Sequence, residues 1–397
     1  MRKFFLFLLS ALGVALLFSG CIKHKIAADP EARGPVLIGA VLPLSGQFSV
    51  SGERMLSGLQ YAEYELNNHR GINNRPVKLL VFDTQSSGDG AEKAFASAAR
   101  SGVSGIICGY SEDEVRSVLP LAEKYSIPSI IPLVTADSTV NANTFVFRNI
   151  YTDRQQGEAL AAYLWYWRQM LRISVLMDVA PESGYERNTA RAVAAAFKEL
   201  GGTVTNMPAY RRDDFSKAVN EALVTGPQAV IVSARGERAG KILKELRRKG
   251  YKGTICGLDN WDSPEFFSTV TPLSDLGDCV YVSYFTPANS TEEFKDFKEN
   301  FRRRHFHEPG NVETASYDAL KLLAIGLGRA ATIEDFRKNW LTIRNHFGAG
   351  ATYTMLRDGN VDRTMYINAL EPGKNGLSSY GRLVRSFMHS KLATYRY

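Results

Sequence analysis

The chain is dominated by one pattern, in which short runs of apolar and β-branched residues alternate with amphipathic stretches. The runs include VLIGAV at 36–41, GIICG at 105–109 and AVIVSA at 229–234, and none of them carries a charged residue. Strands that are apolar on both faces belong inside a parallel sheet that helices cover on both sides. The pattern therefore predicts an α/β fold built on parallel strands.

The alternation falls into two series, which predict two lobes. The first series consists of strands 36–41, 77–83, 105–109, 127–133 and 144–150 with helices 52–68, 90–101 and 112–125. The second consists of helix 153–170, strands 173–178, 203–210, 229–234, 254–259 and 279–285, and helices 185–200, 215–225 and 237–249. Each series is typical of a doubly wound, Rossmann-like sheet, which binds small ligands at the carboxyl ends of its strands.

The last third of the chain contains too few predicted strands to form a third series. It contains predicted helices 292–307, 313–329 and 333–346, and a strand pair around Asp358-Gly359. We expect these segments to return and complete the two lobes. The predicted first lobe joins 35–149 to 287–345, and the second joins 150–286 to 346–370.

Such a division makes the chain cross between the lobes near Ile150–Tyr151, Phe285–Pro287 and His346–Gly348. Connections of this kind absorb the rotation when two lobes close on a ligand. We expect a three-crossing hinge with the ligand site between the lobes.

The first twenty residues are typical of a secretory signal. Arg2-Lys3 precede FFLFLLSALGVALLF, which is shorter than the ~20 apolar residues of a spanning helix, and Ser19-Gly20 precede Cys21. Small residues before a cysteine resemble a bacterial lipoprotein processing site. We expect residues 1–20 to be removed, Cys21 to carry lipid and residues 21–34 to form a polar linker. An ordinary signal or an uncleaved anchor is the alternative.

The charge of the chain does not indicate a nucleic-acid partner. The formal net charge is +7, and the segment 371–397 alone holds five basic residues against one acidic residue. The rest of the exported chain is therefore close to neutral, which lacks the basic footprint of a nucleic-acid-binding domain. The basic C-terminal tail is expected to be solvated, or to touch anionic lipid headgroups.

Three cysteines, Cys108, Cys256 and Cys279, follow Cys21 in the sequence. Export to an oxidising compartment permits one disulfide among them. Cys256 and Cys279 lie on successive predicted strands and form the favoured pair, with buried free thiols as the alternative.

Motifs for catalysis or metal binding are incomplete. Tyr317-x-x-x-Lys321 has the spacing used by short-chain dehydrogenases, but the chain has no N-terminal glycine fingerprint. His305-x-His307 lies in a basic stretch without a third ligand, and a Gly-x-Ser-x-Gly elbow is missing, which disfavours an α/β hydrolase. We expect no enzymatic activity, no cofactor and no metal.

Loops that follow three strands of the first lobe carry hydroxyl groups: Ser45-Gly46, Gly109-Tyr110-Ser111 and Leu133-Val134-Thr135. Hydroxyls and backbone N–H groups are what a carboxylate needs when it leaves water, although helix capping explains the same residues. The first loop lacks phosphate-binding and dinucleotide-binding motifs and contains Phe48. These loops predict a small, polar ligand that is not a nucleotide.

Several segments together resemble one known family. They are LPLSGQFSVSGERMLSGLQYAEYELNN at 42–68, GINNRPVKLLVFDTQ at 71–85, GIICGYSEDEVRSVLPLAEKYSIPSIIPLVTA at 105–136, GYKGTICGLDNWDSPEF at 250–266 and ETASYDALKLLA at 313–324. The chain resembles the periplasmic leucine/isoleucine/valine-binding proteins over residues 35–370, in order. The resemblance implies a type I periplasmic binding protein, a solute receptor of ABC importers for branched-chain amino acids and related molecules.

The resemblance also implies site residues. In the family a serine after the third strand and a backbone/Thr pair after the next strand hold the ligand α-carboxylate, which matches Ser111 and Leu133 to Thr135. An acidic residue in a Gly-x-Asp/Glu loop, here Asp259, holds the α-ammonium, and a tyrosine at a helix start matches Tyr185. The expected ligand-binding set is Ser45, Phe48, Ser111, Leu133, Thr135, Tyr185 and Asp259.

Some residues depart from the family pattern. Gly-Tyr replaces Tyr-Gly at Tyr185, Glu112 and Asp113 follow Ser111, and Arg235 stands where the family often has an aromatic residue. Two carboxylates beside a carboxylate site weaken binding unless they point away. Arg235 either pairs with an additional acidic group on the ligand or faces solvent.

These observations predict a periplasmic, lipid-anchored receptor that binds an amino acid or similar small polar metabolite and delivers it to an ABC permease. A second class of function stays open. The same fold with a degenerate cleft would act as a protein-interaction or regulatory module of the cell envelope.

Overall fold

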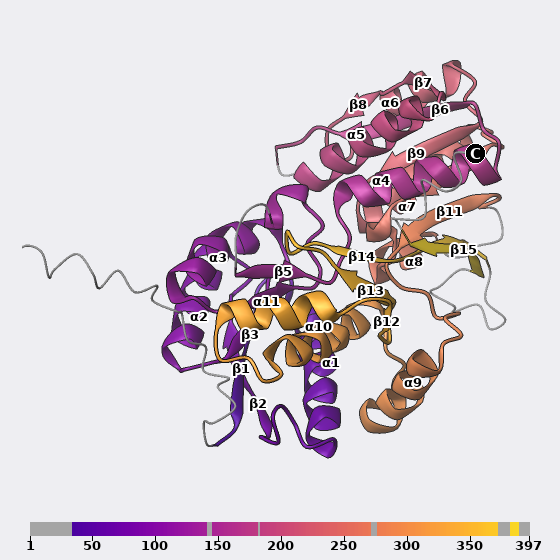
Figure 1. Cartoon of the computed structure of the whole chain (residues 1–397). Helices are drawn as coiled ribbons and strands as arrows, with labels where there is room; N and C mark the ends of the chain where they lie inside the picture. The colour runs from indigo at the N-terminus through magenta and orange to yellow at the C-terminus, as the bar shows by residue number, and fades with distance from the viewer. Residues whose placement is uncertain (1–33, 141–144, 182, 271–275, 372–381, 389–397) are drawn as a thin grey trace, which may run out of the picture.

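The computed structural model describes residues 34–140, 145–181, 183–270, 276–371 and 382–388. Within these ranges the chain forms two lobes, each with helices on both faces of a sheet (Figure 1). The predicted signal segment, Cys21 and almost all of the predicted linker lie outside the described residues. The two-lobe α/β fold predicted from the alternation is confirmed.

The first lobe is built on a five-stranded parallel sheet with the order β2-β1-β3-β4-β5. Its strands are β1 (Val36–Leu42), β2 (Val77–Asp83), β3 (Gly105–Cys108), β4 (Ser129–Ile131) and β5 (Val146–Arg148). Its helices are α1 (Ser49–Asn68), α2 (Gly88–Arg100), α3 (Glu112–Tyr125), α10 (Asn311–Leu327) and α11 (Ile333–Thr342), with the short turn η1 (Asp137–Val140). Every residue of β3, β4 and β5 is buried, as strands with both faces covered require.

The second lobe contains a ten-stranded mixed sheet with the order β12-β13-β14-β11-β10-β9-β6-β7, to which β15 adds on β14 and β8 on β6. The strands are β6 (Arg172–Asp178), β7 (Thr203–Asn206), β8 (Ala209–Tyr210), β9 (Ala229–Ser233), β10 (Thr254–Gly257), β11 (Cys279–Ser283), β12 (His346–Phe347), β13 (Thr352–Met355), β14 (Val361–Ala369) and β15 (Arg382–Met388). The helices are α4 (Asp153–Ala162), η2 (Tyr163–Trp167), α5 (Gly184–Glu199), α6 (Ser216–Val224), α7 (Gly236–Arg248), η3 (Asp259–Trp261) and α8 (Pro264–Val270). Helix α9 (Glu292–His305) follows β11 and packs on the first lobe, where Phe297 and Phe301 contact Tyr61 of α1.

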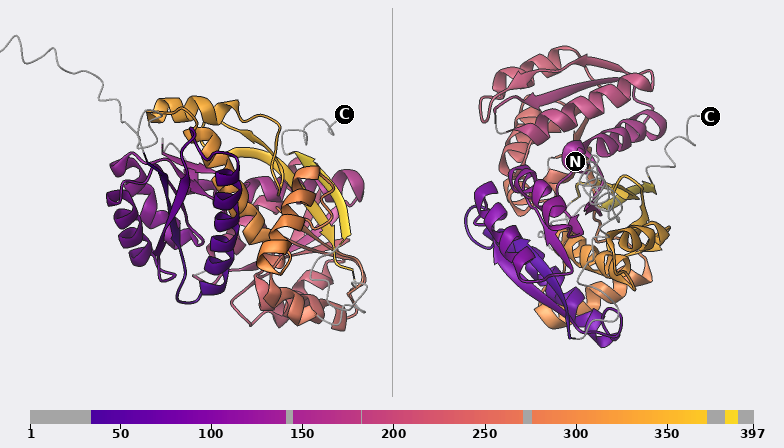
Figure 2. Two further views of the ribbon diagram at one scale, coloured as in Figure 1. Left: turned by 90° about the horizontal axis from the view of Figure 1, so that it is seen from below. Right: turned by 60° about the vertical axis from the view of Figure 1, so that its left-hand side comes forward.

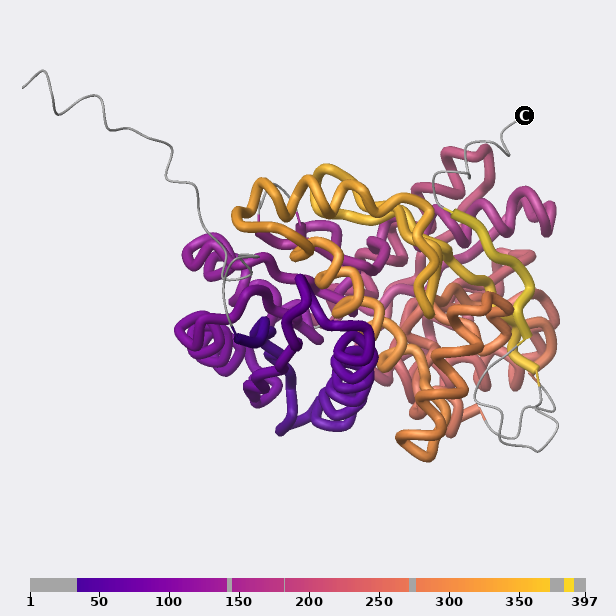
Figure 3. Tube along the Cα trace, turned by 60° about the horizontal axis from the view of Figure 1, so that its bottom comes forward, coloured from indigo at the N-terminus to yellow at the C-terminus, as the bar shows by residue number. Residues whose placement is uncertain are grey.

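The C-terminal third contacts elements of both lobes. In Figure 3 the orange helix α10 lies beside the indigo helix α1, and the two helices pack together. The antiparallel strands β13 and β14 instead extend the second sheet, so the orange-to-yellow part of the chain lies against both lobes in Figure 2. Among the described residues the chain passes between the lobes after β5, after β11 and after α11.

A buried arginine ties these passages together. Arg363 on β14 is 1% exposed and donates to the carbonyl oxygens of Asn149 at 2.9 Å and Tyr284 at 2.7 Å. Asn368, also on β14, donates to the Phe285 carbonyl at 3.1 Å. Side chains of β14 thus satisfy backbone groups on both of the other passages, which removes the cost of leaving those carbonyls unpaired.

The favoured disulfide between Cys256 and Cys279 is wrong, and Cys108, Cys256 and Cys279 are all buried free thiols. In the parallel pair of β10 and β11, Cys279 lies opposite Ile255, and Cys256 lies opposite Val280. Because successive side chains of a strand point to opposite faces, the two sulfurs lie on opposite faces of the sheet. The alternative expectation of buried free thiols holds.

The structure also differs from the predicted elements near the chain's C-terminus. Residues 382–388, expected within a solvated tail, form β15, and the Phe387 ring stacks on Trp167 with centroids 5.7 Å apart. The predicted helix 153–170 ends earlier, at Ala162, and continues as a π-helical turn that includes Trp167. No helix of the described residues has both the length and the apolar character needed to cross a bilayer.

Candidate functional site

A cavity of about 500 Å³ lies in a cleft between the two lobes. The first lobe lines it with the loops after β1, β3 and β4, and the second lobe lines it with the loops after β9, β10 and β11 and the start of α5. Carboxyl ends of parallel strands from both lobes therefore meet at one cleft, which is where open α/β sheets bind ligands.

Most of the expected site residues meet in this cleft. Those that line it are Phe48, Ser111, Leu133, Thr135, Tyr185 and Asp259. Their role as ligand contacts stays a prediction. The structure places Ser45 outside the lining, because the Ser45 hydroxyl donates to Asp83 Oδ2 at 2.6 Å and its N–H to Oδ1 at 3.1 Å. Ser45 therefore anchors its loop to the end of β2.

Ser111 is the N-cap of α3. Its Oγ accepts from the Glu114 N–H at 3.3 Å, and the Glu114 carboxylate accepts from the N–H groups of Tyr110 and Ser111 at 2.9 and 3.0 Å. This capping box agrees with helix capping, the alternative to ligand binding that the sequence left open for this hydroxyl. Because the cap uses Oγ as an acceptor, the hydroxyl proton is still available to a ligand oxygen.

Thr135 is held by a buried carboxyl group. Its hydroxyl donates to Asp153 Oδ1 at 2.6 Å, and the Asp153 N–H donates to the Thr135 carbonyl at 2.8 Å. Asp153 is fully buried, and burial raises its pKa to about 7 although the Thr135 hydrogen bond lowers it. The hydroxyl proton expected to hold a ligand carboxylate is therefore already donated within the protein.

Asp259 lies on the opposite wall, at the first residue of η3, and is 7% exposed. The Tyr185 hydroxyl donates to Asp259 Oδ1 and lies 3.4 Å from Gln156 Oε1. Burial raises the pKa of Asp259 to about 6, against the lowering effects of the Tyr185 hydrogen bond and the Arg235 charge. Ser263, rather than Asp259, caps α8, since its Oγ accepts from the Phe266 N–H at 3.3 Å.

Arg235 pairs within the protein. Its Nε donates to Glu186 Oε1 at 2.7 Å, and its guanidinium carbon lies 5.0 Å from the Tyr185 ring centroid. The Arg235 side chain is 56% exposed, so it contacts Glu186 and Tyr185 on one side and solvent on the other. Of the two carboxylates that follow Ser111, Asp113 turns away to accept the Gly88 N–H at 2.9 Å, and Glu112 lines the cleft.

Sequence reasoning missed several cleft residues. Asn260 and Asp262 lie in the loop that also holds Asp259, and their polar residue types after a buried strand were a usable signal. Arg54 had no such signal, because its bidentate partner is Glu313 on α10, at 2.8 Å for both contacts and 259 residues away. A contact between distant segments leaves no local pattern in a single sequence.

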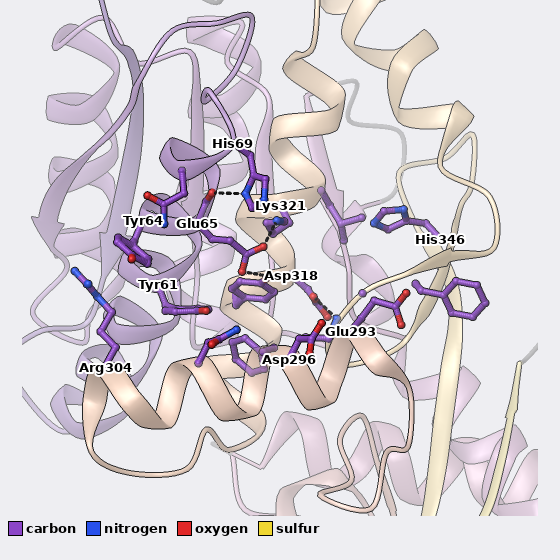
Figure 4. A pocket seen from close by; sticks show the side chains of 18 of the residues that line it. Tyr61, Tyr64, Glu65, His69, Glu293, Asp296, Arg304, Asp318, Lys321 and His346 are labelled. Carbon is purple, nitrogen blue, oxygen red and sulfur yellow. Dashed lines mark hydrogen bonds and ion pairs between the residues drawn. The ribbon is translucent and has the colours of Figure 1, made fainter.

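A larger cavity, of about 830 Å³, lies away from the cleft beside α1, α9 and α10 (Figure 4). Its lining includes Tyr317 and Lys321, whose side chains both donate to Glu65, Tyr317 at 2.8 Å and Lys321 at 2.5 Å. Burial and the Glu65 carboxylate raise the pKa of Tyr317 well above its usual range. The catalytic tyrosine of a short-chain dehydrogenase needs a lowered pKa, so Tyr317 and Lys321 do not form such a catalytic pair here.

His305 and His307 were the candidate metal ligands of the sequence, and each ring contacts Phe301. The His305 ring stacks on Phe301 with centroids 4.2 Å apart, and the ring of His307 contacts Phe301 edge-on. Within the ranges that the structure describes, no group of three or more His, Cys, Asp or Glu side chains is arranged to hold a metal ion.

Comparisons with known proteins agree with this geometry. A family model described as "Periplasmic binding protein" matches residues 35–375. The chain is 24% identical to the Leu/Ile/Val-binding protein BraC3 of Rhizobium johnstonii, over 84% of this chain and 87% of the relative.

Solved structures share the fold. The branched-chain amino acid transporter substrate-binding protein LivJ from Streptococcus pneumoniae, in complex with isoleucine, has a TM-score of 0.75 at 21% identity and covers 89% of this chain and 99% of its own. An ABC transporter substrate-binding protein from Sphaerobacter thermophilus has a TM-score of 0.80 at 19% identity and covers 89% of this chain and 98% of its own. With a family model that spans most of its length and two lobes that face each other across one cleft, the chain belongs to the periplasmic binding protein family, as an extracytoplasmic solute-binding protein and not an enzyme.

Proposed function

We propose that this protein is the lipid-anchored receptor of an ABC importer, and that it binds an amino acid in the interlobe cleft. The observation that carries the proposal is the buried carboxyl group of Asp259, held in place by the Tyr185 hydroxyl at the cleft wall. An ammonium group that leaves water needs a formal negative charge and hydrogen-bond acceptors. Asp259 supplies both in one side chain.

The opposite wall offers groups for the ligand carboxylate. The Ser111 hydroxyl stands at the N-terminus of α3, where the helix dipole favours negative charge. The loop Leu133 to Thr135 lies beside it in the lining. Since Thr135 donates its hydroxyl proton to Asp153, we assign the contribution of this loop to its backbone.

Related proteins support an amino-acid ligand. The relative from Rhizobium johnstonii is described as a Leu/Ile/Val-binding protein, and the Streptococcus pneumoniae structure holds isoleucine. Transfer of the ligand class to this chain rests on the shared fold and on Asp259. The identity of the ligand side chain is a separate question, because Arg235 and Glu112 place charged groups in the cleft lining.

The test is calorimetry with a panel of amino acids on the unaltered protein and on Asp259→Asn. We expect at least one amino acid to bind the unaltered protein and to lose about 2–5 kcal/mol of binding free energy in the variant, the cost of burying its ammonium without a charge partner. Glu265→Gln is the control, because Glu265 is an exposed carboxylate of the same cleft lining. Equal affinity in the unaltered protein and Asp259→Asn would contradict the assigned role.

If no amino acid binds at all, the alternative of an envelope interaction module replaces this proposal. Closure gives an independent readout, since small-angle scattering with saturating ligand should show compaction if the three passages act as a hinge. An unchanged scattering profile with a bound ligand would argue against closure.

The lipid anchor and the permease rest on the sequence and the family. If Cys21 carries lipid, Cys21→Ser should move the protein from the membrane fraction to the soluble fraction of the envelope. Recovery that stays in the membrane, without acyl chains detectable by mass spectrometry, would show that the anchor is not at Cys21.

A further inference from the structure

We infer that the ligand carries a second positive charge, at the end of its side chain, and that Asp262 receives this charge next to Asp259. The inference rests on the proposed function, because it takes the first positive charge to be the α-ammonium of an amino acid. It narrows the ligand to amino acids whose side chains end in an ammonium or guanidinium group.

Asp262 lines the cleft and has one buried carboxylate oxygen without a hydrogen-bond partner among the described residues. The residue is 6% exposed and lines the cavity. Its Oδ2 accepts from the Ser283 hydroxyl at 2.8 Å, whereas Oδ1 has no hydrogen-bond partner among the described residues. A buried carboxylate oxygen without a partner is costly, and a ligand donor removes that cost.

Asp262 lies close in the chain to Asp259, the residue proposed to bind the α-ammonium group. Asp259 begins the 3₁₀ turn η3, and Asp262 follows directly after the turn, three residues later. Side chains three apart in a 3₁₀ turn lie above one another on the same face. The two carboxyl groups therefore face the same cavity from one short loop, as the two cationic groups of a diamino acid require.

Asn260 adds polar atoms to the same loop. It lines the cavity, and neither its Oδ1 nor its Nδ2 has a hydrogen-bond partner among the residues that the structure describes. An amide oxygen beside a carboxylate provides a further acceptor for an ammonium or guanidinium group. The loop thus has polar atoms without a partner at two positions, Asn260 and Asp262, with Trp261 between them.

The cations of the lining do not balance these carboxylates. The acidic residues of the lining are Glu112, Glu237, Asp259, Asp262 and Glu265, and the basic ones are Arg54 and Arg235. Lys241, outside the lining, pairs with Glu237 at 2.8 Å, which leaves Glu112, Asp259, Asp262 and Glu265 for the comparison. Each arginine already holds a carboxylate outside the lining: Arg54 pairs with Glu313 at 2.8 Å, and Arg235 pairs with Glu186 at 2.7 Å. The cleft therefore favours a cationic side chain over an anionic or aliphatic one.

The experiment compares amino acids that differ only in the terminal charge. Calorimetry on the unaltered protein would measure L-lysine against L-norleucine, which lacks the amine, and L-arginine against L-citrulline, which replaces the guanidinium by a neutral group. We expect the charged member of at least one pair to bind roughly tenfold or more tightly, as a buried charge pair requires. This comparison needs no variant, so a folding defect cannot obscure it.

Asp262→Asn then assigns the effect to one residue. We expect it to abolish the preference for the charged side chain and to leave the affinity for its neutral counterpart nearly unchanged. Glu237→Gln removes an exposed charge from the same lining and should retain the preference.

The two proposals fail in different ways. Binding of L-leucine or L-norleucine as tightly as L-lysine and L-arginine would overturn the inference and leave the proposed function standing. A charge preference that survives in Asp262→Asn would overturn the assignment to Asp262. The absence of binding by every amino acid tested would overturn the proposed function, and the inference with it.

Discussion

The two walls of the cleft differ in how far the protein itself satisfies their polar groups. On the first-lobe wall, Ser111 accepts in a capping box and Thr135 donates to Asp153. On the second-lobe wall, Asp262 Oδ1 and the Asn260 amide have no hydrogen-bond partner among the described residues. The polar groups of the first wall are satisfied by hydrogen bonds within the protein, whereas the second wall keeps buried polar atoms without a partner among the described residues.

This difference separates stability from binding. Groups that already exchange hydrogen bonds inside the protein contribute mainly to folding, because a ligand has to compete with an existing partner. Groups that are buried without a partner lower stability and increase the gain from binding. Substitutions on the two walls should therefore act on different measurements.

The largest expected effect is on binding, at the second wall. Asp259→Asn should weaken binding of an amine-bearing ligand by about 2–5 kcal/mol while the far-ultraviolet circular dichroism stays that of the unaltered protein. Calorimetry of both proteins with the same ligand measures it. Ser111→Ala is the matched change on the first wall, and a larger binding loss there would reverse the comparison.

The next effect is the pH dependence of stability without ligand. Burial raises the pKa of Asp262 to about 7, so the folded protein takes up this proton at a pH where the unfolded chain is still ionised. Stability should therefore rise as pH falls from about 8 to 5, by about 1–3 kcal/mol for a carboxyl group with such a shift. Asp259, with a pKa raised to about 6, acts in the same direction.

Denaturant unfolding at several pH values would measure this rise, and Asp262→Asn should make it shallower. Part of the rise should persist, because burial also raises the pKa of Asp153 to about 7 and that of Asp259 to about 6. Arg54 and Asp259 are the charged groups that act on Asp262, and the variant leaves both in place. A slope that is the same with and without the Asp262 carboxyl would mean that its pKa is close to that of an exposed aspartate.

A smaller effect is expected on stability, at the first wall. Ser111→Ala removes the N-cap of α3 and should lower the free energy of unfolding by about 1 kcal/mol. Ser111→Asp, which keeps a capping oxygen, should restore much of that loss. Chemical denaturation compares the three proteins, and a stability unchanged in Ser111→Ala would show that the capping box contributes little.

The smallest effect is expected at the rim of the second wall. Glu265→Gln removes an exposed carboxylate from the lining and should change both stability and binding by no more than about 0.5 kcal/mol. A loss as large as that of Asp259→Asn would mean that the rim, and not the buried loop, carries the charge recognition.

Much of the architecture follows from local pattern in the sequence. Apolar runs followed by amphipathic stretches are sufficient to indicate parallel sheets, because only such sheets bury both faces of a strand. The loops after those strands placed Ser111 and Asp259 near one cleft, since the carboxyl ends of parallel strands share an edge, whereas Tyr185 was expected only from the resemblance to a known family. The resemblance to a known family added the pairing of lobes and the roles expected of these residues.

Contacts between distant segments could not be predicted. The face on which Cys256 and Cys279 lie depends on the register of β10 and β11, and a shift of one residue exchanges the faces. The strand β15 depends on a free edge of β14 and on the Trp167 ring, far away in the sequence. Neither feature leaves a periodic signal in its own segment.

The sequence by itself determined the two lobes, the loops that face the cleft and the acidic residue expected to meet an ammonium group. Only the tertiary structure decided which of those groups are free to bind. Ser45 and Thr135 donate their hydroxyl protons to Asp83 and Asp153, whereas Asp262 Oδ1 has no partner among the described residues. The physical reason is that a hydrogen bond depends on which donor and acceptor the fold brings within about 3 Å of each other, and residue type alone does not specify that.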